Sequence, residues 1–209
     1  MNTDLRDGPK FPSRAWWQRW SVVLLIAAVT LVLALGGEPG REWGRYDRTG
    51  LENGELWRLL TGHLVHLGFG HLWPNLLALV VIGSLFEDVL RPLEWLVVAV
   101  VCALAIDAGL YGLDPGVQWY VGLSGVLHGF VACGALLLLR KRQAIGWMLA
   151  IGLGAKLAWE HWAGPVPFTA ASVGGPVIVA AHLYGATAGA LSALALTPVR
   201  GARSRRSLI

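Results

Sequence analysis

Long apolar runs separated by shorter polar segments are the most regular feature of the chain. A helix needs about 20 apolar residues to cross ~30 Å of hydrocarbon, and these runs approach that length with few charges. The pattern predicts an all-α membrane protein in which a bundle of six transmembrane helices resides in the bilayer. The predicted spans are residues 20–35, 72–86, 93–111, 124–139, 145–162 and 177–196.

Composition supports the same class. The 209 residues are 55% hydrophobic and 14% charged, with a mean hydropathy of +0.56, which is too apolar for a soluble domain of this size. We expect a cytoplasmic N-terminal tail in residues 1–19, a six-helix membrane domain in residues 20–196 and a basic cytoplasmic C-terminal tail in residues 197–209.

The basic residues predict the orientation. One side of the predicted bundle collects 12 of the 17 Lys and Arg residues, and the positive-inside rule makes that side the cytoplasm, with both termini inside. A basic tail also occurs in nucleic-acid-binding proteins. Here it indicates a topology signal that contacts the anionic lipid bilayer, so no nucleic-acid partner is expected.

The segment Gly122-Leu123-Ser124-Gly125 places a serine where an apolar helix begins. A serine becomes a nucleophile when a histidine reaches it. His128 lies one turn further along the same helix, which leaves little room for a substrate between the two side chains. His182 is the better partner, because its small neighbours allow two helix backbones to approach closely.

Topology brings further polar groups to the same depth. With the N-terminus inside, the second, fourth and sixth spans begin at the outer surface, and His71, Asn75, Ser124 and His182 lie in their first turns. At ~1.5 Å per residue, all four should lie within about 10 Å of that surface. His71 and Asn75 can donate hydrogen bonds to a developing oxyanion. Pro74, between them, is expected in the first helical turn, where its missing N–H costs nothing.

Three charged residues lie inside predicted spans. Lys156 and Glu160 are one turn apart and are expected to pair with each other, and Asp107 is expected to be structural. These charges also permit a small transporter or channel, although the two halves of the chain lack internal symmetry. No metal-ligand spacing is present, so no metal and no cofactor is predicted.

Two other segments receive structural interpretations. Cys102 and Cys133 are expected to be small apolar packing residues. The Gly- and Pro-rich loop 163–176, which precedes His182, is expected to act as a flap over the site.

The sequence resembles the rhomboid family of intramembrane serine proteases over about residues 20–196. The likeness rests on four motifs in order: Glu55-Leu56-Trp57-Arg58, His71 to Asn75, Gly122-Leu123-Ser124-Gly125, and Ala181-His182 with Gly185 and Gly189. The longer string from Gly122 to Gly129 more closely resembles the rhombosortase branch, whose substrates carry a Gly-rich C-terminal tail followed by a transmembrane helix and basic residues.

The resemblance implies a role for each matched residue. Ser124 would be the catalytic nucleophile and His182 the general base, while His71, Asn75 and the Ser124 backbone N–H would form the oxyanion hole. His128 stands where many rhomboids have a tyrosine that packs on the catalytic histidine. Supporting roles fall to His128, Gly122, Gly125 and Gly185, and a structural loop motif to Glu55, Trp57 and Arg58. With no acidic third member evident, packing alone should orient His182.

The expected function is hydrolysis of a peptide bond at the outer edge of a bacterial inner membrane by a multi-pass enzyme. The expected partner is a transmembrane protein with a C-terminal Gly-rich tail. Two alternatives remain open: a general rhomboid protease with another membrane substrate, and a non-catalytic rhomboid-like protein that binds membrane helices.

Overall fold

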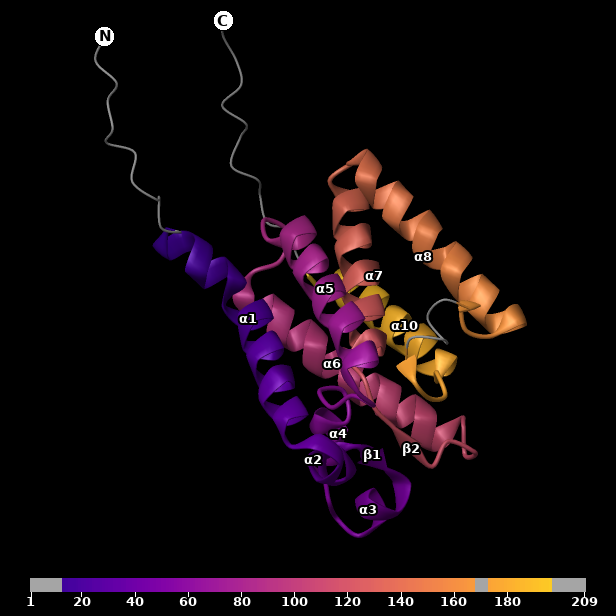
Figure 1. The fold of residues 1–209 in the computed structure, drawn as a ribbon. Helices are drawn as coiled ribbons and strands as arrows, with labels where there is room; N and C mark the ends of the chain where they lie inside the picture. The colour runs from indigo at the N-terminus through magenta and orange to yellow at the C-terminus, as the bar shows by residue number, and fades with distance from the viewer. Residues whose placement is uncertain (1–12, 168–172, 197–209) are drawn as a thin grey trace, which may run out of the picture.

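Helices make up most of the computed structural model, which describes residues 13–167 and 173–196 (Figure 1). The long helices are α1 (Arg14–Leu35), α5 (Phe69–Phe86), α6 (Pro92–Gly112), α7 (Ser124–Arg140), α8 (Ala144–Ala163) and α10 (Val179–Ala195). The short elements are α2 (Gly37–Gly44), β1 (Tyr46–Asp47), α3 (Arg48–Glu52), α4 (Arg58–Thr61) and β2 (Trp119–Tyr120).

Each of the six predicted spans coincides with a long helix. Three of them, α1, α5 and α6, are long and apolar enough to cross a membrane, and α7 and α10 are shorter apolar helices. The prediction of an all-α membrane protein is therefore confirmed at the level of its helices. That all six cross the bilayer, and in which direction, remains a prediction.

Two helix starts differ from expectation. α1 begins at Arg14 instead of residue 20, because the Ser13 hydroxyl accepts a hydrogen bond from Trp16 N at 3.2 Å and caps the helix there. α5 begins at Phe69, so Pro74 lies inside the helix and not in its first turn. The expectation for Pro74 was wrong: its ring nitrogen leaves the Gly70 carbonyl without the usual helical donor. The predicted tails, up to residue 12 and from residue 197, lie outside the described residues.

The connection from α1 to α5 folds into a small cap at the lower end of the view in Figure 1. It contains α2, α3 and α4 together with β1, which pairs antiparallel with β2 in the register Tyr46 to Tyr120 and Asp47 to Trp119. Because β2 directly precedes α7, the cap determines where α7 begins.

α7 lies at the centre of the bundle and contacts α5, α6, α8 and α10. Its closest neighbour is α10, where glycines face each other: a Cβ on Gly185 would lie 2.0 Å from Gly125 O, and one on Gly189 would lie 2.0 Å from Gly129 O. Lipid offers helices little hydrophobic drive to associate, so such close backbone packing is a main source of their attraction.

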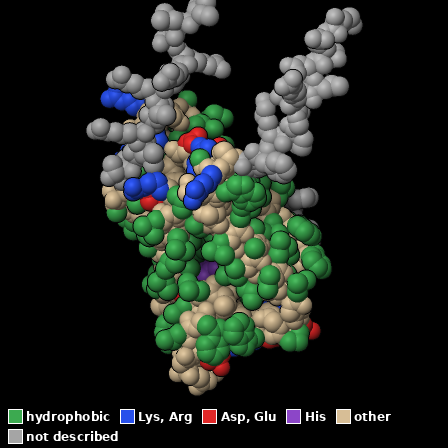
Figure 2. Space-filling view, turned by 90° about the vertical axis from the view of Figure 1, so that its left-hand side faces the viewer, with side chains coloured by type: hydrophobic (Ala, Val, Ile, Leu, Met, Phe, Trp, Pro, Cys, Tyr) green, Lys and Arg blue, Asp and Glu red, His purple; other side chains and the backbone are tan. Residues whose placement is uncertain are grey.

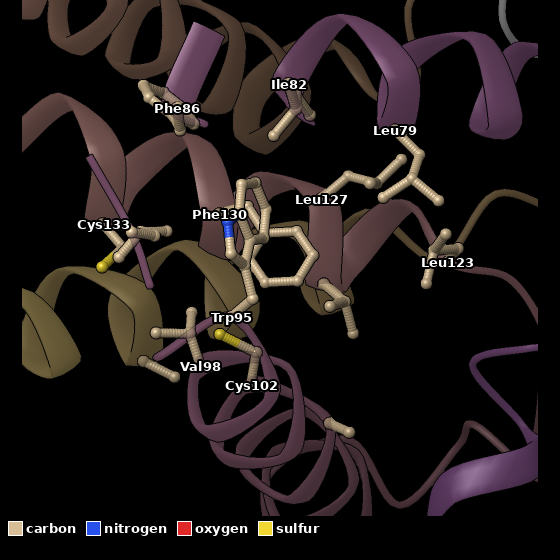
Figure 3. Close-up of a cluster of buried hydrophobic side chains, with 14 of the residues drawn as sticks. Leu79, Ile82, Phe86, Trp95, Val98, Cys102, Leu123, Leu127, Phe130 and Cys133 are labelled. Atoms are coloured by element: carbon tan, nitrogen blue, oxygen red, sulfur yellow. The ribbon is translucent and has the colours of Figure 1, made fainter. Parts of the chain in front are cut away.

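A cluster of aliphatic, aromatic and cysteine side chains packs around α7 (Figure 3). Phe130 packs edge-to-face on Trp95 of α6, with ring centroids 4.6 Å apart. Cys102 and Cys133 are free and buried in the same cluster, which confirms their predicted packing role.

The outer surface is largely apolar. Figure 2 shows hydrophobic side chains over the middle of one face, charged side chains toward its two ends and a histidine in a central hollow. Large exposed hydrophobic residues occur on all the long helices except α7, including Val32, Leu77, Leu104, Ile151 and Leu191. A surface of this kind suits contact with lipid.

Candidate active site

Ser124 is the first residue of α7, and the cap fixes its position. The preceding Gly122 has a φ of +120°, which favours glycine, and a Cβ there would lie 2.6 Å from the His71 ring. Gly122 N donates to Gly62 O at 2.9 Å, and the Tyr120 hydroxyl donates to Gly122 O at 2.7 Å. Two independent hydrogen bonds therefore hold the turn that presents the serine.

The cap also contains the motif Glu55, Trp57 and Arg58. Its contacts hold the segment that leads into β1, and β1 in turn pairs with the strand before the Ser124 turn. The Arg58 guanidinium pairs with Glu55 and donates to the carbonyls of Glu42 and Arg45, each at 2.9 Å. Trp57 stacks on Trp43 and donates to its carbonyl at 3.3 Å. Since Arg45 precedes β1, these contacts brace the strand on which β2 pairs.

His182 reaches Ser124 from α10. The Ser124 Oγ lies 2.9 Å from His182 Nε2, which is hydrogen-bond distance. The approach depends on two glycines, since a Cβ on Gly125 would also lie 2.9 Å from Ala181 O. Any larger residue at Gly125 or Gly185 would push α10, and His182 with it, away from α7.

His128 lies against one face of the His182 ring. The two imidazoles stack with centroids 4.1 Å apart and planes at 12°, and His128 Nδ1 donates to Ser124 O at 2.7 Å. The Ser124 hydroxyl contacts His182 and not His128 among these residues. This geometry fits a packing platform.

His71 and Asn75 enter the same space from α5. A cavity of about 420 Å³ is lined by both residues and by Ser124, His128 and His182. Asn75 Nδ2 donates one hydrogen to His71 O at 2.8 Å, so its second hydrogen remains available. The first turns of α7 and α10 and the first two turns of α5 thus meet at one cavity. The expectation that Asn75 lies in a first turn was wrong, because α5 begins at Phe69, and the depth of the cavity in the bilayer remains a prediction.

The backbone N–H of Ser124 belongs to the same group of donors. The hydrogen bonds of α7 begin with Leu127 N donating to Leu123 O. Amides at the start of a helix have no intrahelical acceptor, and the helix dipole makes them favourable for negative charge.

A carboxylate contacts His182 on its other side, which the sequence did not predict. Glu160 Oε2 lies 2.9 Å from His182 Nδ1, and Glu160 Oε1 lies 2.6 Å from Lys156 Nζ. The expected Lys156–Glu160 pair is present, but the expectation that packing alone orients His182 was wrong. A signal was available, because Glu160 lies near the end of its helix that the sequence predicts to be at the outer surface, which is the depth expected for the site.

His128, Glu160 and His182 are also a potential metal-binding group, with one ligand atom from each lying within 4.8 Å of the others. The arrangement suits hydrogen bonding better than metal ligation. Both His182 nitrogens already have partners, and the lone pairs of two nearly parallel rings do not converge on one ion. We therefore assign no metal to the site.

Asp107 pairs with His63, which is not among the residues that line the cavity. Its Oδ1 lies 3.2 Å from His63 Nε2, and both side chains are 2% exposed. The apolar loop expected as a flap contributes Val173 and Pro176 to the cavity lining, while residues 168–172 lie outside the described residues.

The fold and the site define a helical membrane protein with a hydrogen-bonded Ser–His pair in a cavity between its helices. Residues 53–199 match the Rhomboid domain family, and the chain belongs to the rhomboid family. Among curated proteins it is similar to "Putative rhomboid protease YdcA" of Bacillus subtilis (strain 168), at 31% identity over 97 residues, covering 46% of this chain. The chain spans about half the length of that relative, 49%. Family and apolar helices together identify a multi-pass membrane protein.

Proposed function

We propose that the protein is an intramembrane serine endopeptidase that cleaves transmembrane substrates near the outer face of a bacterial inner membrane. The observation that carries the proposal is the 2.9 Å separation of Ser124 Oγ and His182 Nε2. Family membership and the similarity to a protein named as a rhomboid protease support it.

The chemistry is acyl transfer. His182 Nε2 takes the hydroxyl proton as Ser124 Oγ bonds to the scissile carbonyl carbon. The His71 and Asn75 side chains and the Ser124 N–H stabilise the resulting oxyanion. The C–N bond then breaks, the proton passes from His182 to the leaving amine, and an incoming water repeats the sequence to release the acyl group.

The cavity supports a peptide substrate. Its lining beyond the polar groups is largely apolar and includes residues of α5, such as Ala78 and Ile82, and of α8, such as Met148 and Leu149, with further residues from α7 and from the segment before α10. Only an unwound backbone exposes its peptide bond to a nucleophile, so we expect cleavage where a transmembrane helix is destabilised by small residues. Entry of the substrate from the bilayer places this segment over Ser124.

The first test combines labelling with cleavage. A serine-directed fluorophosphonate should label the wild-type protein and not the Ser124→Ala variant. Ser124→Ala and His182→Ala should each abolish cleavage of a transmembrane reporter in proteoliposomes, and the double variant should be no worse, because the two residues act as a unit. More than a few per cent activity in Ser124→Ala would contradict the serine-protease proposal. Protein that is neither labelled nor active would favour the non-catalytic binder of membrane helices.

The narrower proposal is a rhombosortase, supported by the string from Gly122 to Gly129. A tail with a Gly-rich motif, one apolar helix and a basic end would present the motif to Ser124, because the basic end stays inside. Deleting the gene should leave such proteins uncut and retained in the membrane, and replacing the Gly pair by Leu should block cutting. Normal processing of every such tail leaves the general protease with another substrate.

A transporter or channel has less support. Asp107 pairs with His63, and Glu160 contacts both Lys156 and His182. Each of these carboxylates therefore has a partner within the bundle, as expected for a structural pair and not for a polar path across the membrane.

A further inference from the structure

Glu160 is unusual for its helix. α8 is exposed along most of its length, and the residues that it buries are Gly146, near its start, and Glu160, near its end. The buried side chain is thus a carboxylate, only 3% exposed, where an apolar residue would cost far less to bury. A buried carboxylate on an otherwise exposed helix calls for an explanation in its contacts.

The contacts use both oxygens. Oε1 accepts from Lys156 Nζ at 2.6 Å, and Oε2 accepts from His182 Nδ1 at 2.9 Å. Lys156 is 33% exposed and lines the cavity, whereas Glu160 is buried behind it. An ion pair with Lys156 alone would not require the carboxylate to face α10.

The contact with His182 has a chemical consequence. A neutral imidazole carries one proton, and it accepts the serine proton at Nε2 only when that proton is on Nδ1. A carboxylate at Nδ1 selects this tautomer, fixes the ring plane toward Ser124 and stabilises the imidazolium that forms during attack. The stacked His128 ring restrains the same plane from the side.

We propose that Glu160 is a positioning residue for His182, so that this protein uses a Ser124–His182–Glu160 arrangement, with Lys156 holding the carboxylate in place. The proposal rests on the proposed function, because it assigns Glu160 a role in the same proton transfer. Glu160 does not contact the substrate in this scheme, and the Nδ1 proton stays on His182 throughout.

The decisive experiment compares Glu160→Gln and Glu160→Asp with wild type in proteoliposomes. Glu160→Gln keeps the size of the side chain but presents an amide to Nδ1, so kcat should fall on the order of 10²-fold or more while KM changes by less than about twofold. Glu160→Asp, which keeps the carboxylate, should recover a large part of kcat. The rate of fluorophosphonate labelling at Ser124 should follow kcat.

Two further variants separate positioning from packing. Asp107→Asn alters another buried carboxylate near a histidine and should leave kcat per folded molecule within about threefold of wild type, since Asp107 does not contact the His182 chain of groups. Lys156→Met should lower kcat less than Glu160→Gln, and Lys156→Met combined with Glu160→Gln should be no worse than Glu160→Gln alone, because Lys156 acts through Glu160.

The outcomes are distinguishable. If Ser124→Ala abolishes cleavage while Glu160→Gln keeps kcat within threefold of wild type, the positioning role is wrong and the serine protease stands. If Glu160→Gln and Glu160→Asp lose activity only in proportion to folded protein, the role is structural and the proposal fails. If Ser124→Ala retains cleavage, the proposed function fails first and the role of Glu160 with it.

Discussion

Two buried histidine–carboxylate pairs occur among the described residues, and they differ in what surrounds them. His182 pairs with Glu160 at 2.9 Å and His63 with Asp107 at 3.2 Å. At the first pair, the second imidazole nitrogen contacts Ser124 and the second carboxylate oxygen contacts a lysine. At the second pair, His63 Nδ1 and Asp107 Oδ2 have no hydrogen-bond partner among the described residues.

The two histidines also differ in the aromatic ring that packs on them. His182 stacks nearly parallel on His128 at 4.1 Å, whereas His63 has Tyr120 at 5.4 Å with the planes tilted by 57°. A hydrogen-bonded imidazole and carboxylate therefore do not define a reaction centre. What distinguishes the His182 pair is that each remaining polar atom is used and that the chain of contacts ends at a nucleophile beside a cavity.

The sharpest test of this comparison is to remove each histidine in turn. His182→Ala should abolish cleavage with little loss of stability. His63→Ala should retain cleavage per folded molecule but lower the free energy of unfolding by about 1–3 kcal/mol, because Asp107 is left buried without its partner. Thermal unfolding in detergent and reporter cleavage, measured on the same preparations, separate the two effects. Loss of cleavage in a fully folded His63→Ala protein would mean that the His63–Asp107 pair also contributes to the reaction.

A second test concerns the donors on the other side of Ser124. Asn75→Ala should lower kcat by roughly 10- to 1000-fold, as expected for one oxyanion donor among several, without a comparable change in KM. Asn75→Asp is a useful companion, since it keeps the shape but places negative charge where the oxyanion forms. An Asn75→Ala protein as active as wild type would assign the amide to the hydrogen bond that it makes with His71 O, which is a structural role.

Much of the architecture follows from patterns that the sequence displays. Apolar runs locate all six long helices, because length and hydrophobicity decide helix formation in a bilayer. Small residues such as Gly125 and Gly185 indicate where two helix backbones can approach closely. The predicted starts of three spans indicate which polar residues lie at a similar depth.

Other contacts depend on which face of a helix turns toward its neighbours. When a helix is apolar on all sides, the periodicity of its sequence does not reveal that face. Glu160 shares a face with Lys156 by sequence spacing, but whether that face turns toward His182 depends on how α8 packs on α7 and α10. The Asp107–His63 pair joins a helix to a loop 44 residues away, so no local rule points to it. The start of the helix that contains Pro74 was predicted too late. Backbone hydrogen bonds to Gly68 O begin the helix before His71, and such local turns are not visible in the hydrophobic pattern.

A third test concerns the stacked ring that only the His182 pair has. His128→Tyr should retain most activity, and His128→Ala should lose about 2- to 12-fold, which corresponds to the roughly 0.5–1.5 kcal/mol of a close aromatic pair. Both follow from packing on His182. If His128 were the base, both substitutions would be as damaging as loss of Ser124, and a side-by-side cleavage assay distinguishes these outcomes.

The smallest expected effect extends the comparison to a buried histidine without a carboxylate. Burial, and then the neighbouring His71, lowers the pKa of His66 to about 3 from 6.5, and the ring packs edge-on against His71 at 4.8 Å. Native His66 therefore stays neutral at pH 5, whereas the unfolded chain binds a proton below pH 6.5. Acidification favours the state that binds the proton, so stability falls as the pH drops below 6.5, by at most about 1.4 kcal/mol for each pH unit.

His66→Gln should remove this contribution while keeping an acceptor for Leu123 N, which lies 3.5 Å from His66 Nε2. Its unfolding free energy should change less than that of wild type between pH 7.5 and pH 5.5, and the exposed His161→Gln variant controls for loss of a histidine. Equal pH dependence in wild type and His66→Gln would mean that His66 binds its proton in the native state. A buried histidine would then need no carboxylate to carry charge here, and the importance of Glu160 to His182 would rest on orientation alone.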